Sequence, residues 1–208
     1  MTVAAGRWIT LEGGDGSGKS TQAALLTEWL EESGRTALRT REPGGSEVGR
    51  LIRDIVLHHR GEIAPRAEAL LYAADRAHHV ATVVRPALER GDIVVQDRYL
   101  DSSVAYQGAG RVLDATEVRD LSLWATQGAL PDLTVLLDLD PSTARRRLDA
   151  DDKPFDRLEA EKEDFHARVR RAFLQLAAAE PQRFLVVDAG ADADDIAVLI
   201  RARVALLL

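Results

Sequence analysis

The eight residues Gly13–Ser20 read GGDGSGKS, and no other segment restricts the possible folds of this chain as strongly. They fit the pattern G-x-x-x-x-G-K-[ST], which is meaningful where a strand precedes it and a helix follows it. Both conditions hold here. The apolar run Arg7–Glu12 comes directly before the pattern, and apolar residues recur at helical spacing from Leu25 to Leu30 after it. The sequence therefore predicts a phosphate-binding loop between a first strand and a first helix.

The chemistry of such a loop follows from its residue types. Glycines let the backbone turn its N–H groups inward around phosphates, and the helix N-terminus adds partial positive charge. Lys19 would reach the β- and γ-phosphates, and the hydroxyl group of Ser20 would bind Mg²⁺. The chain has only three lysines, which argues against a chance lysine at this position. The predicted ATP-binding residues are Gly13, Gly14, Asp15, Gly16, Ser17, Gly18, Lys19, Ser20 and Thr21.

Strand patterns and helical patterns alternate from one end of the chain to the other. The strands are expected at Arg7–Glu12, Thr36–Thr40, Asp92–Gln96, Leu133–Leu139 and Phe184–Asp188. Helical spacing marks the segments between them, among them 80–88, where Pro86 should kink the helix, 165–176, and a last stripe of Ile196, Leu199, Ile200, Val204 and Leu207. This order predicts an α/β fold with a five-stranded parallel sheet, helices on both faces, and ligand-binding loops at the carboxyl ends of the strands. We expect one domain over residues 1–208, because no repeat or low-complexity linker interrupts the pattern.

Charge and composition exclude several classes of protein. The formal charge is −7, whereas a nucleic-acid or anionic-membrane binder is expected to carry a basic surplus. The chain has no cysteine, which excludes disulfides and thiolate metal sites and fits a reducing compartment. Residues 1–7 do not resemble a signal peptide, and the apolar stretch 196–208 is far shorter than the ~20 residues that span a bilayer. We therefore expect a cytoplasmic protein that binds neither nucleic acid nor membranes.

Phosphate-binding loops of this kind also occur in GTPases, motors and large ATP-driven machines. Guanine recognition usually depends on an N/T-K-x-D element, but this chain has no asparagine and no Thr-Lys pair. A motor or a large ATPase would need a longer chain. A kinase for a small acceptor is the class that remains.

Four further segments lie after the expected strands or on the helices beside them. They are TREPGG at 40–45, LLYAADR at 70–76, DRY at 97–99 with SSVAYQG at 102–108, and DRLE at 156–159. Together with EGGDGSGKST and LLDLDP, this ordered set resembles the bacterial thymidylate kinases over nearly the whole chain. The resemblance implies a nucleoside-monophosphate-kinase fold with a lid segment, transfer of a phosphoryl group from ATP to dTMP with Mg²⁺, and usually a homodimer.

The residues themselves support an acceptor site for a pyrimidine nucleotide. Tyr72 and Arg76 are four positions apart, hence on one helical face, and a ring beside a guanidinium suits a base with an exocyclic oxygen. Arg98 follows a buried strand, where an unpaired charge is costly, and a bidentate contact with the acceptor phosphate would account for it. Asp97 is then a candidate to hold Mg²⁺ or its waters. Two structural alternatives stay open: Tyr72 in the core with Arg76 as a surface charge, and an internal Asp97–Arg98 ion pair.

The resemblance assigns roles around the base and the sugar. It implies that Tyr72 stacks on thymine, that Arg76 contacts O4, and that Ser103 lies near the N3 edge. It also implies that Tyr106 packs against the sugar, where it disfavours a 2′-hydroxyl group. Asp15 would accept a hydrogen bond from the 3′-hydroxyl group.

The remaining acceptor-side residues are assigned more loosely. Arg41 and Glu42 are expected in the phosphate and metal region, and Gln107 completes the acceptor-binding set. Because the acceptor is already a phosphate dianion, no general base is needed. Catalysis is then in-line positioning and neutralisation of charge, chiefly by Lys19, Arg98, Mg²⁺ and a cation from the lid.

The lid, expected near residues 149–157, departs from the family pattern. Gly16 means that the phosphate-binding loop carries no arginine, so by resemblance the lid should supply one. The segment is acidic and nearly free of arginine, and it leaves Arg147, Lys153 and Arg157 as candidates to reach the γ-phosphate. Lys153 and Arg157 join Lys19, Asp97 and Arg98 in the predicted catalytic set.

Three other functions stay open. The first is another nucleotide kinase or a deoxynucleoside kinase of the same fold, in which Glu12 or Glu42 would act as the base for a 5′-hydroxyl group. The second is a kinase for a modified nucleotide or an antibiotic-like small molecule. The third is a non-catalytic nucleotide-binding protein.

The histidines do not predict a metal site. His58–His59 and His78–His79 are adjacent pairs, so their side chains diverge by about 100° on a helix. Two ligands for one ion would need to share a face.

Overall fold

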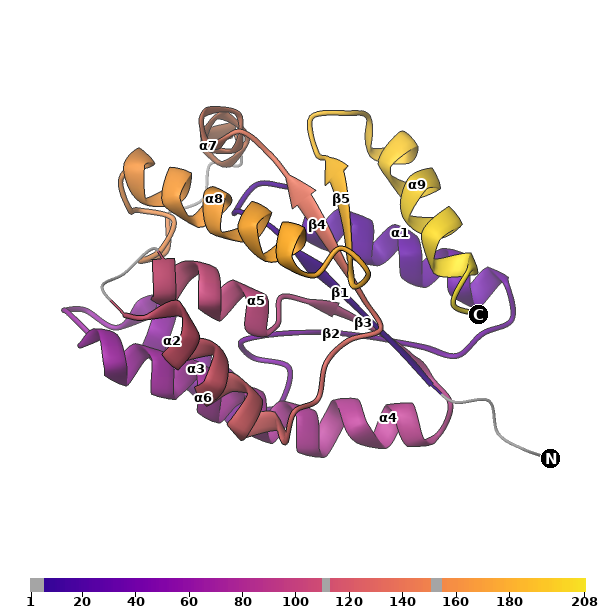
Figure 1. The fold of residues 1–208 in the computed structure, drawn as a ribbon, viewed down its shortest axis with the longest axis horizontal. Helices are drawn as coiled ribbons and strands as arrows, with labels where there is room; N and C mark the ends of the chain where they lie inside the picture. Colours follow the sequence, from indigo (N-terminus) through magenta and orange to yellow (C-terminus); the bar gives the residue numbers. More distant parts are fainter. Residues whose placement is uncertain (1–5, 110–112, 151–154) are drawn as a thin grey trace.

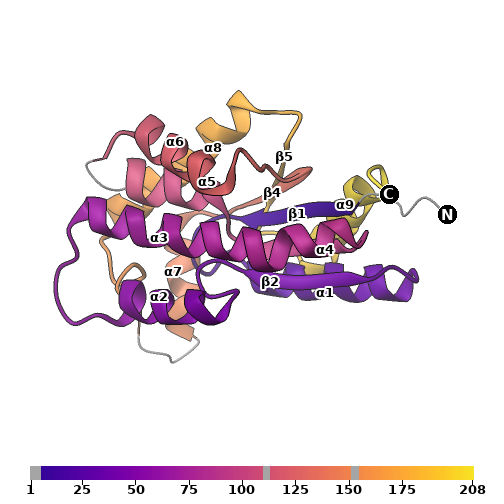
Figure 2. The same cartoon turned by 90° about the horizontal axis from the view of Figure 1, so that it is seen from below.

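The computed structural model describes residues 6–109, 113–150 and 155–208, shown from two directions in Figures 1 and 2. Five strands form one parallel sheet in the order β2-β3-β1-β4-β5. They are β1 (Arg7–Glu12), β2 (Ala37–Arg41), β3 (Ile93–Asp97), β4 (Leu133–Asp138) and β5 (Phe184–Asp188). Each predicted strand is present, and no boundary differs from its prediction by more than one residue.

Helices connect and flank the strands. The α-helices are α1 (Lys19–Glu32), α2 (Glu47–His58), α3 (Pro65–His79), α4 (Arg85–Glu89), α5 (Leu100–Ser103), α6 (Ala115–Thr126), α7 (Pro141–Ala150), α8 (Glu163–Ala179) and α9 (Ala193–Ala205). Two π-helical segments, η1 (Val80–Val84) and η2 (Val104–Ala109), extend α3 and α5. Pro86, where a kink was expected, lies in the first turn of α4, and η1 ends directly before that helix. None of the described helices is both long and apolar enough to cross a membrane.

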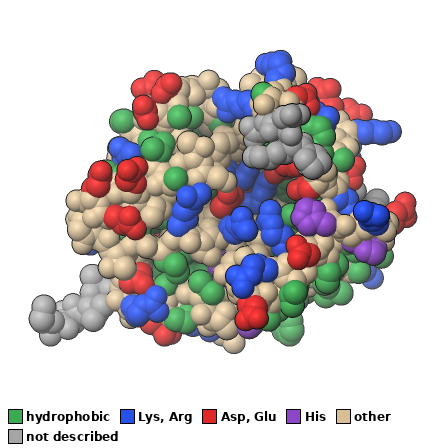
Figure 3. Space-filling view, turned by 180° about the vertical axis from the view of Figure 1, so that it is seen from behind, with side chains coloured by type: hydrophobic (Ala, Val, Ile, Leu, Met, Phe, Trp, Pro, Cys, Tyr) green, Lys and Arg blue, Asp and Glu red, His purple; other side chains and the backbone are tan. Residues whose placement is uncertain are grey.

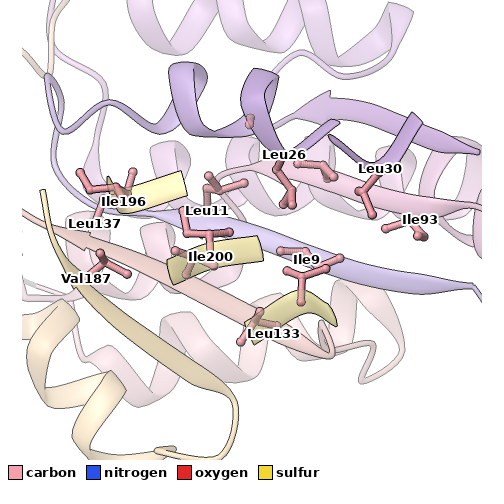
Figure 4. Close-up of a cluster of buried hydrophobic side chains, with 14 of the residues drawn as sticks. Ile9, Leu11, Leu26, Leu30, Ile93, Leu133, Leu137, Val187, Ile196 and Ile200 are labelled. Atoms are coloured by element: carbon pink, nitrogen blue, oxygen red, sulfur yellow. The ribbon is translucent and has the colours of Figure 1, made fainter. Parts of the chain in front are cut away.

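One face of the sheet is covered by α1 and α9. Figure 4 shows their side chains gathered over those of β1, β3, β4 and β5. Because side chains alternate along a strand, every second residue of β1 points to this layer. Full burial of each Leu or Ile here contributes about 1.5–3 kcal/mol relative to exposure. The buried cluster includes Ile9, Leu11, Leu26, Leu30, Val95, Val135, Ile196 and Ile200.

The opposite face carries the helices that shape the acceptor side. Trp8 and Val94 pack there against η1 and α4, and Leu136 packs in a separate cluster with α8. The sheet therefore lies between two helical layers, as Figure 1 shows and as the sequence predicts.

The carboxyl ends of three strands meet at one edge of the sheet. Asp97 is in register with Leu11 of β1 and with Arg41 of β2. The loops that follow these strands therefore start side by side, although they begin at residues 13, 42 and 98.

Candidate active site

The phosphate-binding loop has the backbone geometry that its glycines allow. Gly13 and Gly18 have φ angles of 137° and 91°, a region that other residues rarely adopt. A Cβ atom on Gly13 would also lie 2.5 Å from the carbonyl oxygen of Leu137. The loop leads directly into α1, which begins at Lys19. The N-terminus of α1 thus points its unpaired N–H groups at the space enclosed by the loop.

The amino group of Lys19 is buried against this loop. Its Nζ donates hydrogen bonds to the carbonyl oxygens of Gly13 and Gly14, at 3.1 and 2.7 Å. Burial, together with the nearby Arg98 guanidinium, lowers the pKa of Lys19 to about 8. Lys19 is therefore a desolvated cation at neutral pH, which strengthens its attraction for phosphate.

The turn after β3 is held by a buried carboxylate. Arg98 adopts a left-handed backbone conformation with φ 66°, which is uncommon for an arginine. Its N–H donates to the carbonyl oxygen of Leu11, while Glu12 accepts from the Tyr99 N–H at 2.7 Å and from the Ser102 hydroxyl at 2.5 Å. The end of β1 thus fixes the turn that presents Arg98.

Arg98 forms an ion pair with Asp15 of the phosphate-binding loop. Its guanidinium also lies over the Tyr106 ring, 5.1 Å from the centroid, and the Tyr106 hydroxyl donates to Asp15 at 2.9 Å. Burial disfavours the charge of Asp15, but Arg98 and Lys19 outweigh it and lower the pKa of this carboxyl to about 2. An internal Asp97–Arg98 pair, the alternative left open by the sequence, is not formed.

Asp97 instead accepts a hydrogen bond from the hydroxyl group of Ser20 at 2.9 Å. These are the two residues predicted to hold Mg²⁺, and they are brought together from β3 and α1. One carboxylate and one hydroxyl beside a phosphate site suit Mg²⁺, which usually keeps several waters and uses few protein ligands. The donor set therefore fits this ion.

Arg76 is a buried residue rather than a surface charge, and its side chain is 2 % exposed. Its guanidinium donates to Glu42 at 2.9 Å, to Ser122 at 3.0 Å and to Ser103 at 3.1 Å. Glu42, expected near the phosphates and metal, is thus engaged by Arg76 and also by His79. Tyr72 is buried within a core cluster and still contributes to the cavity wall.

Two glycines of TREPGG form the turn, as expected. Gly44 has φ 103°, and a Cβ atom on Gly45 would lie 2.4 Å from the His79 ring. The close approach of this ring to the backbone requires glycine at position 45.

A cavity of about 690 Å³ joins these parts. In the view of Figure 3, Lys and Arg side chains gather in and around a hollow of the surface. Cations concentrated in one hollow explain how a chain of charge −7 can hold anions. The lining includes the predicted residues Asp15, Gly16, Gly18, Lys19, Ser20, Thr21, Arg41, Glu42, Tyr72, Arg76, Asp97, Arg98, Ser103, Tyr106 and Gln107.

Arg53 also lines the cavity, although no motif in the sequence marks it. Its guanidinium donates to the carbonyl oxygen of Pro43 at 3.0 Å. Arg53 lies four residues after Gly49 and four before Leu57, both buried, so helical spacing could have placed this charge on the inner face of α2. Arg39, Asp156 and Glu159 are further lining residues without a predicted role.

The three candidate lid cations are not gathered at one place. Arg157 forms an ion pair with Glu68 and donates to the Val56 carbonyl oxygen at 3.0 Å; it is not among the described residues that line the cavity. Arg147 is exposed and donates to the carbonyl oxygen of Ala189 at 3.0 Å. Lys153 lies outside the described residues, as does part of the predicted lid.

Comparison with known proteins gives one consistent result. A family model described as thymidylate kinase matches residues 11–200. A thymidylate kinase from Clavibacter sepedonicus is 75 % identical over 203 residues, which are 98 % of this chain and 96 % of that protein. One from Leifsonia xyli subsp. xyli is 73 % identical over 198 residues, covering 95 % and 94 %.

A solved structure agrees with these sequences. The crystal structure of thymidylate kinase from Ehrlichia chaffeensis matches with a TM-score of 0.74 and 31 % identity, over 88 % of this chain and 93 % of that one. The fold is thus the P-loop nucleoside-monophosphate-kinase fold that the resemblance implied. With its phosphate-binding loop, its acceptor-side arginines and these matches, the chain belongs to the thymidylate kinase family.

Proposed function

We propose that this chain phosphorylates dTMP to dTDP, with ATP as donor and Mg²⁺ as cofactor, by in-line phosphoryl transfer. The observation that carries the proposal is the single cavity that joins the phosphate-binding loop, the Arg98 turn and the Tyr72–Arg76 helix face. Membership in the thymidylate kinase family supports the choice of acceptor.

On the donor side, residues 13–21 would enclose the phosphates of ATP. Lys19 would exchange its hydrogen bonds with the loop carbonyls for the β- and γ-phosphates. Ser20 and Asp97 would hold Mg²⁺, which supplies charge neutralisation when bound. The lid cation is proposed from Arg147, Lys153 and Arg157, of which Arg157 would first have to leave Glu68.

On the acceptor side, Arg98 would hold the phosphate of dTMP and align it with the donor. Tyr72 would stack on the base and Arg76 would contact its O4, with Ser103 beside it. Asp15 would bind the 3′-hydroxyl group and Tyr106 would exclude a 2′-hydroxyl group.

Arg41 and Gln107 complete the acceptor-binding residues that we propose. Arg41 is exposed and Gln107 is buried, and both line the cavity. The Gln107 amide donates to Glu68 at 2.9 Å, and Glu68 also holds Arg157. The acceptor wall and the candidate lid cation thus share one carboxylate.

Two carboxylates bear on the alternative of a nucleoside kinase. Glu12 does not line the cavity among the described residues, and its oxygens hold the turn at Tyr99 and Ser102. Glu42 lines the cavity, but both of its oxygens are engaged by Arg76 and His79. Neither carboxylate is placed to deprotonate a 5′-hydroxyl group, and this favours a phosphate acceptor.

The test is an assay of ADP release with Mg-ATP and each of dTMP, dUMP, thymidine, CMP, UMP, AMP and GMP. We expect strong preference for dTMP, with UMP and thymidine nearly inert. Activity on thymidine instead would make the chain a nucleoside kinase. ATP binding without turnover of any acceptor would contradict a catalytic role.

We also propose a homodimer that forms through α2, α3 and α6. These helices lie side by side in Figure 2. They expose apolar side chains that a monomer rarely leaves in water, namely Val48, Leu51, Ile55, Leu70 and Trp124. A second copy of the chain would cover them. We further propose that residues 1–208 act as one catalytic domain of a cytoplasmic enzyme, without contact to nucleic acid or membranes.

A further inference from the structure

A chain of polar side chains connects residues of the cavity wall at Arg76 through a buried histidine. Thr40, near the end of β2, contacts His79 at the end of α3. His79 contacts Glu42 in the turn that follows β2, and Glu42 contacts Arg76. The side chains of His79, Glu42 and Arg76 are 0 %, 2 % and 2 % exposed. Water therefore has little access to the contacts among these three side chains.

Both nitrogens of the His79 ring are used. Nδ1 lies 2.9 Å from Oε1 of Glu42, and Nε2 lies 2.7 Å from the hydroxyl oxygen of Thr40. A ring with its proton on Nδ1 donates to the carboxylate and accepts from the hydroxyl, so one tautomer satisfies both contacts. The Glu42 carboxylate can only accept, so it requires the ring proton on Nδ1, and the Thr40 hydroxyl group then donates to Nε2.

The two carboxylate oxygens of Glu42 have different partners. Oε1 faces His79, and Oε2 accepts from Nε of Arg76 at 2.9 Å. If the ring were absent, Oε1 would be a buried acceptor without a partner, and the carboxylate would gain by rotating towards another donor. Rotation would move Oε2 away from Arg76, which is the residue proposed to contact the acceptor base.

The surroundings leave the ring little freedom. A Cβ atom on Gly45 would overlap the His79 ring, and Asp75, also buried, accepts from the Gly44 N–H at 3.1 Å. His79, Glu42, Asp75 and Arg76 thus form one packed cluster beneath the turn. The neighbouring His78 is only half-buried, and its side chain has a different direction.

We propose that His79 is a positioning residue for the acceptor: it orients Glu42, Glu42 orients Arg76, and the chain thereby sets the affinity for dTMP but not for ATP. The inference rests on the proposed function, in which Arg76 contacts the acceptor base. It gives a role to a histidine that is not among the described residues lining the cavity.

Three variants separate the two contacts of the ring. His79→Asn keeps an amide N–H near the position of Nδ1, His79→Gln places its amide near Nε2, and His79→Leu removes both contacts. His78→Gln is the matched control at the adjacent position. For each variant we would measure kcat, KM for dTMP and for ATP, the Kd for dTMP by calorimetry, and thermal unfolding.

We expect His79→Leu to raise KM and Kd for dTMP about tenfold to a hundredfold, the range for a lost hydrogen bond to a charged group. KM for ATP should change less than about twofold, because in the proposed function ATP binds at residues 13–21 and not at this chain of residues. His79→Asn should recover most of the affinity, His79→Gln little of it, and His78→Gln should match the wild type.

Thr40→Val keeps the test informative if His79→Leu does not fold. It removes only the hydroxyl group at Nε2, in a half-buried residue, and should raise KM for dTMP about threefold, the effect of a modest hydrogen bond. Wild-type affinity for dTMP in a folded His79→Leu variant would overturn the positioning role. Equal losses of affinity for ATP and for dTMP in His79→Leu would also overturn it. So would a His79→Asn variant that recovers none of the affinity for dTMP. Inactivity of the wild type on dTMP would instead overturn the proposed function itself.

Discussion

At the scale of single residues, Glu12 shows how a buried carboxylate can shape a site without lining it. Its oxygens accept from Tyr99 N–H and from the Ser102 hydroxyl, and thereby hold the turn that presents Arg98. Burial, and then the nearby Asp101 carboxylate, raise the pKa of Glu12 to about 7 from an ordinary value of 4.5. Between these pH values the folded protein binds the proton more tightly than the unfolded chain does.

This shift predicts a pH-dependent stability. The contribution of Glu12 to the free energy of unfolding is complete below about pH 4.5 and is lost as the pH rises through about 7. The free energy of unfolding should fall by about 1–3 kcal/mol over this range. Glu12→Gln keeps an acceptor for the N–H and a donor for Ser102 but cannot titrate. Urea unfolding of both proteins from pH 4.5 to 8 should show the wild type losing stability relative to the variant. A difference that stays constant with pH would contradict the shift.

Sequence reasoning identified the residue types of the site more completely than their pairing. Five of the residues that the sequence assigns to the site line one cavity, namely Lys19, Asp97, Arg98, Tyr72 and Arg76. The partner of Arg98 was not predictable, because Asp15 lies 83 positions away and meets it only after the sheet has formed. Local adjacency suggested Asp97 instead, but the left-handed turn at Arg98 directs the two side chains to different partners.

At the scale of the elements, α5 depends on a buried ion pair that links it to the turn before β5. Both nitrogens of the Arg183 fork donate to Asp101, at 2.7 and 2.8 Å, and Arg183 also donates to Thr134 and Glu180. Asp101 is fully buried. Since α5 also carries Ser102 and Ser103, the pair stabilises the acceptor wall from behind.

We predict that Arg183→Met destabilises the protein by about 3–5 kcal/mol, because it leaves a buried carboxylate without a partner. The double variant Arg183→Met with Asp101→Asn should lose clearly less stability than Arg183→Met alone. As a control, Arg66→Met breaks an exposed pair with Glu117 and should change stability by no more than about 0.5 kcal/mol. Chemical unfolding measures all three. An Arg183→Met variant as stable as the wild type would show that the Arg183–Asp101 pair contributes nothing to stability.

The elements themselves were largely predictable, since their signals are local. Alternating strand and helix patterns gave the sheet and its two layers, because burial on both faces requires continuous apolar strands. The apolar stripe predicted for the last helix was less accurate. Ile196, Ile200 and Val204 are buried at a spacing of four, whereas Leu199 is 56 % exposed. A helix that packs by one narrow stripe leaves the neighbouring position at its edge in water.

At the scale of the whole molecule, the exposed apolar side chains of α2, α3 and α6 predict the oligomeric state. We expect Leu51→Glu to convert the proposed dimer to a monomer in sedimentation equilibrium, because the charge would be buried without a partner. Leu206→Glu introduces the same charge at a residue that is also exposed but lies directly after α9, away from these helices, and should leave the proposed dimer intact. A wild-type chain that is monomeric at micromolar concentration would contradict this interface.

In the proposed reaction, the γ-phosphoryl group of ATP is transferred to dTMP in the cavity, and Lys19 and Arg98 neutralise its charge. The most direct measurement follows label from γ-³²P-ATP into separated nucleotides, for the wild type, Lys19→Ala and Arg98→Ala, with circular dichroism as a check of folding. We expect labelled dTDP from the wild type, and a rate lower by at least about 10²–10³-fold in each folded variant. Label that appears only as inorganic phosphate, or near-normal dTDP formation by either variant, would contradict the account.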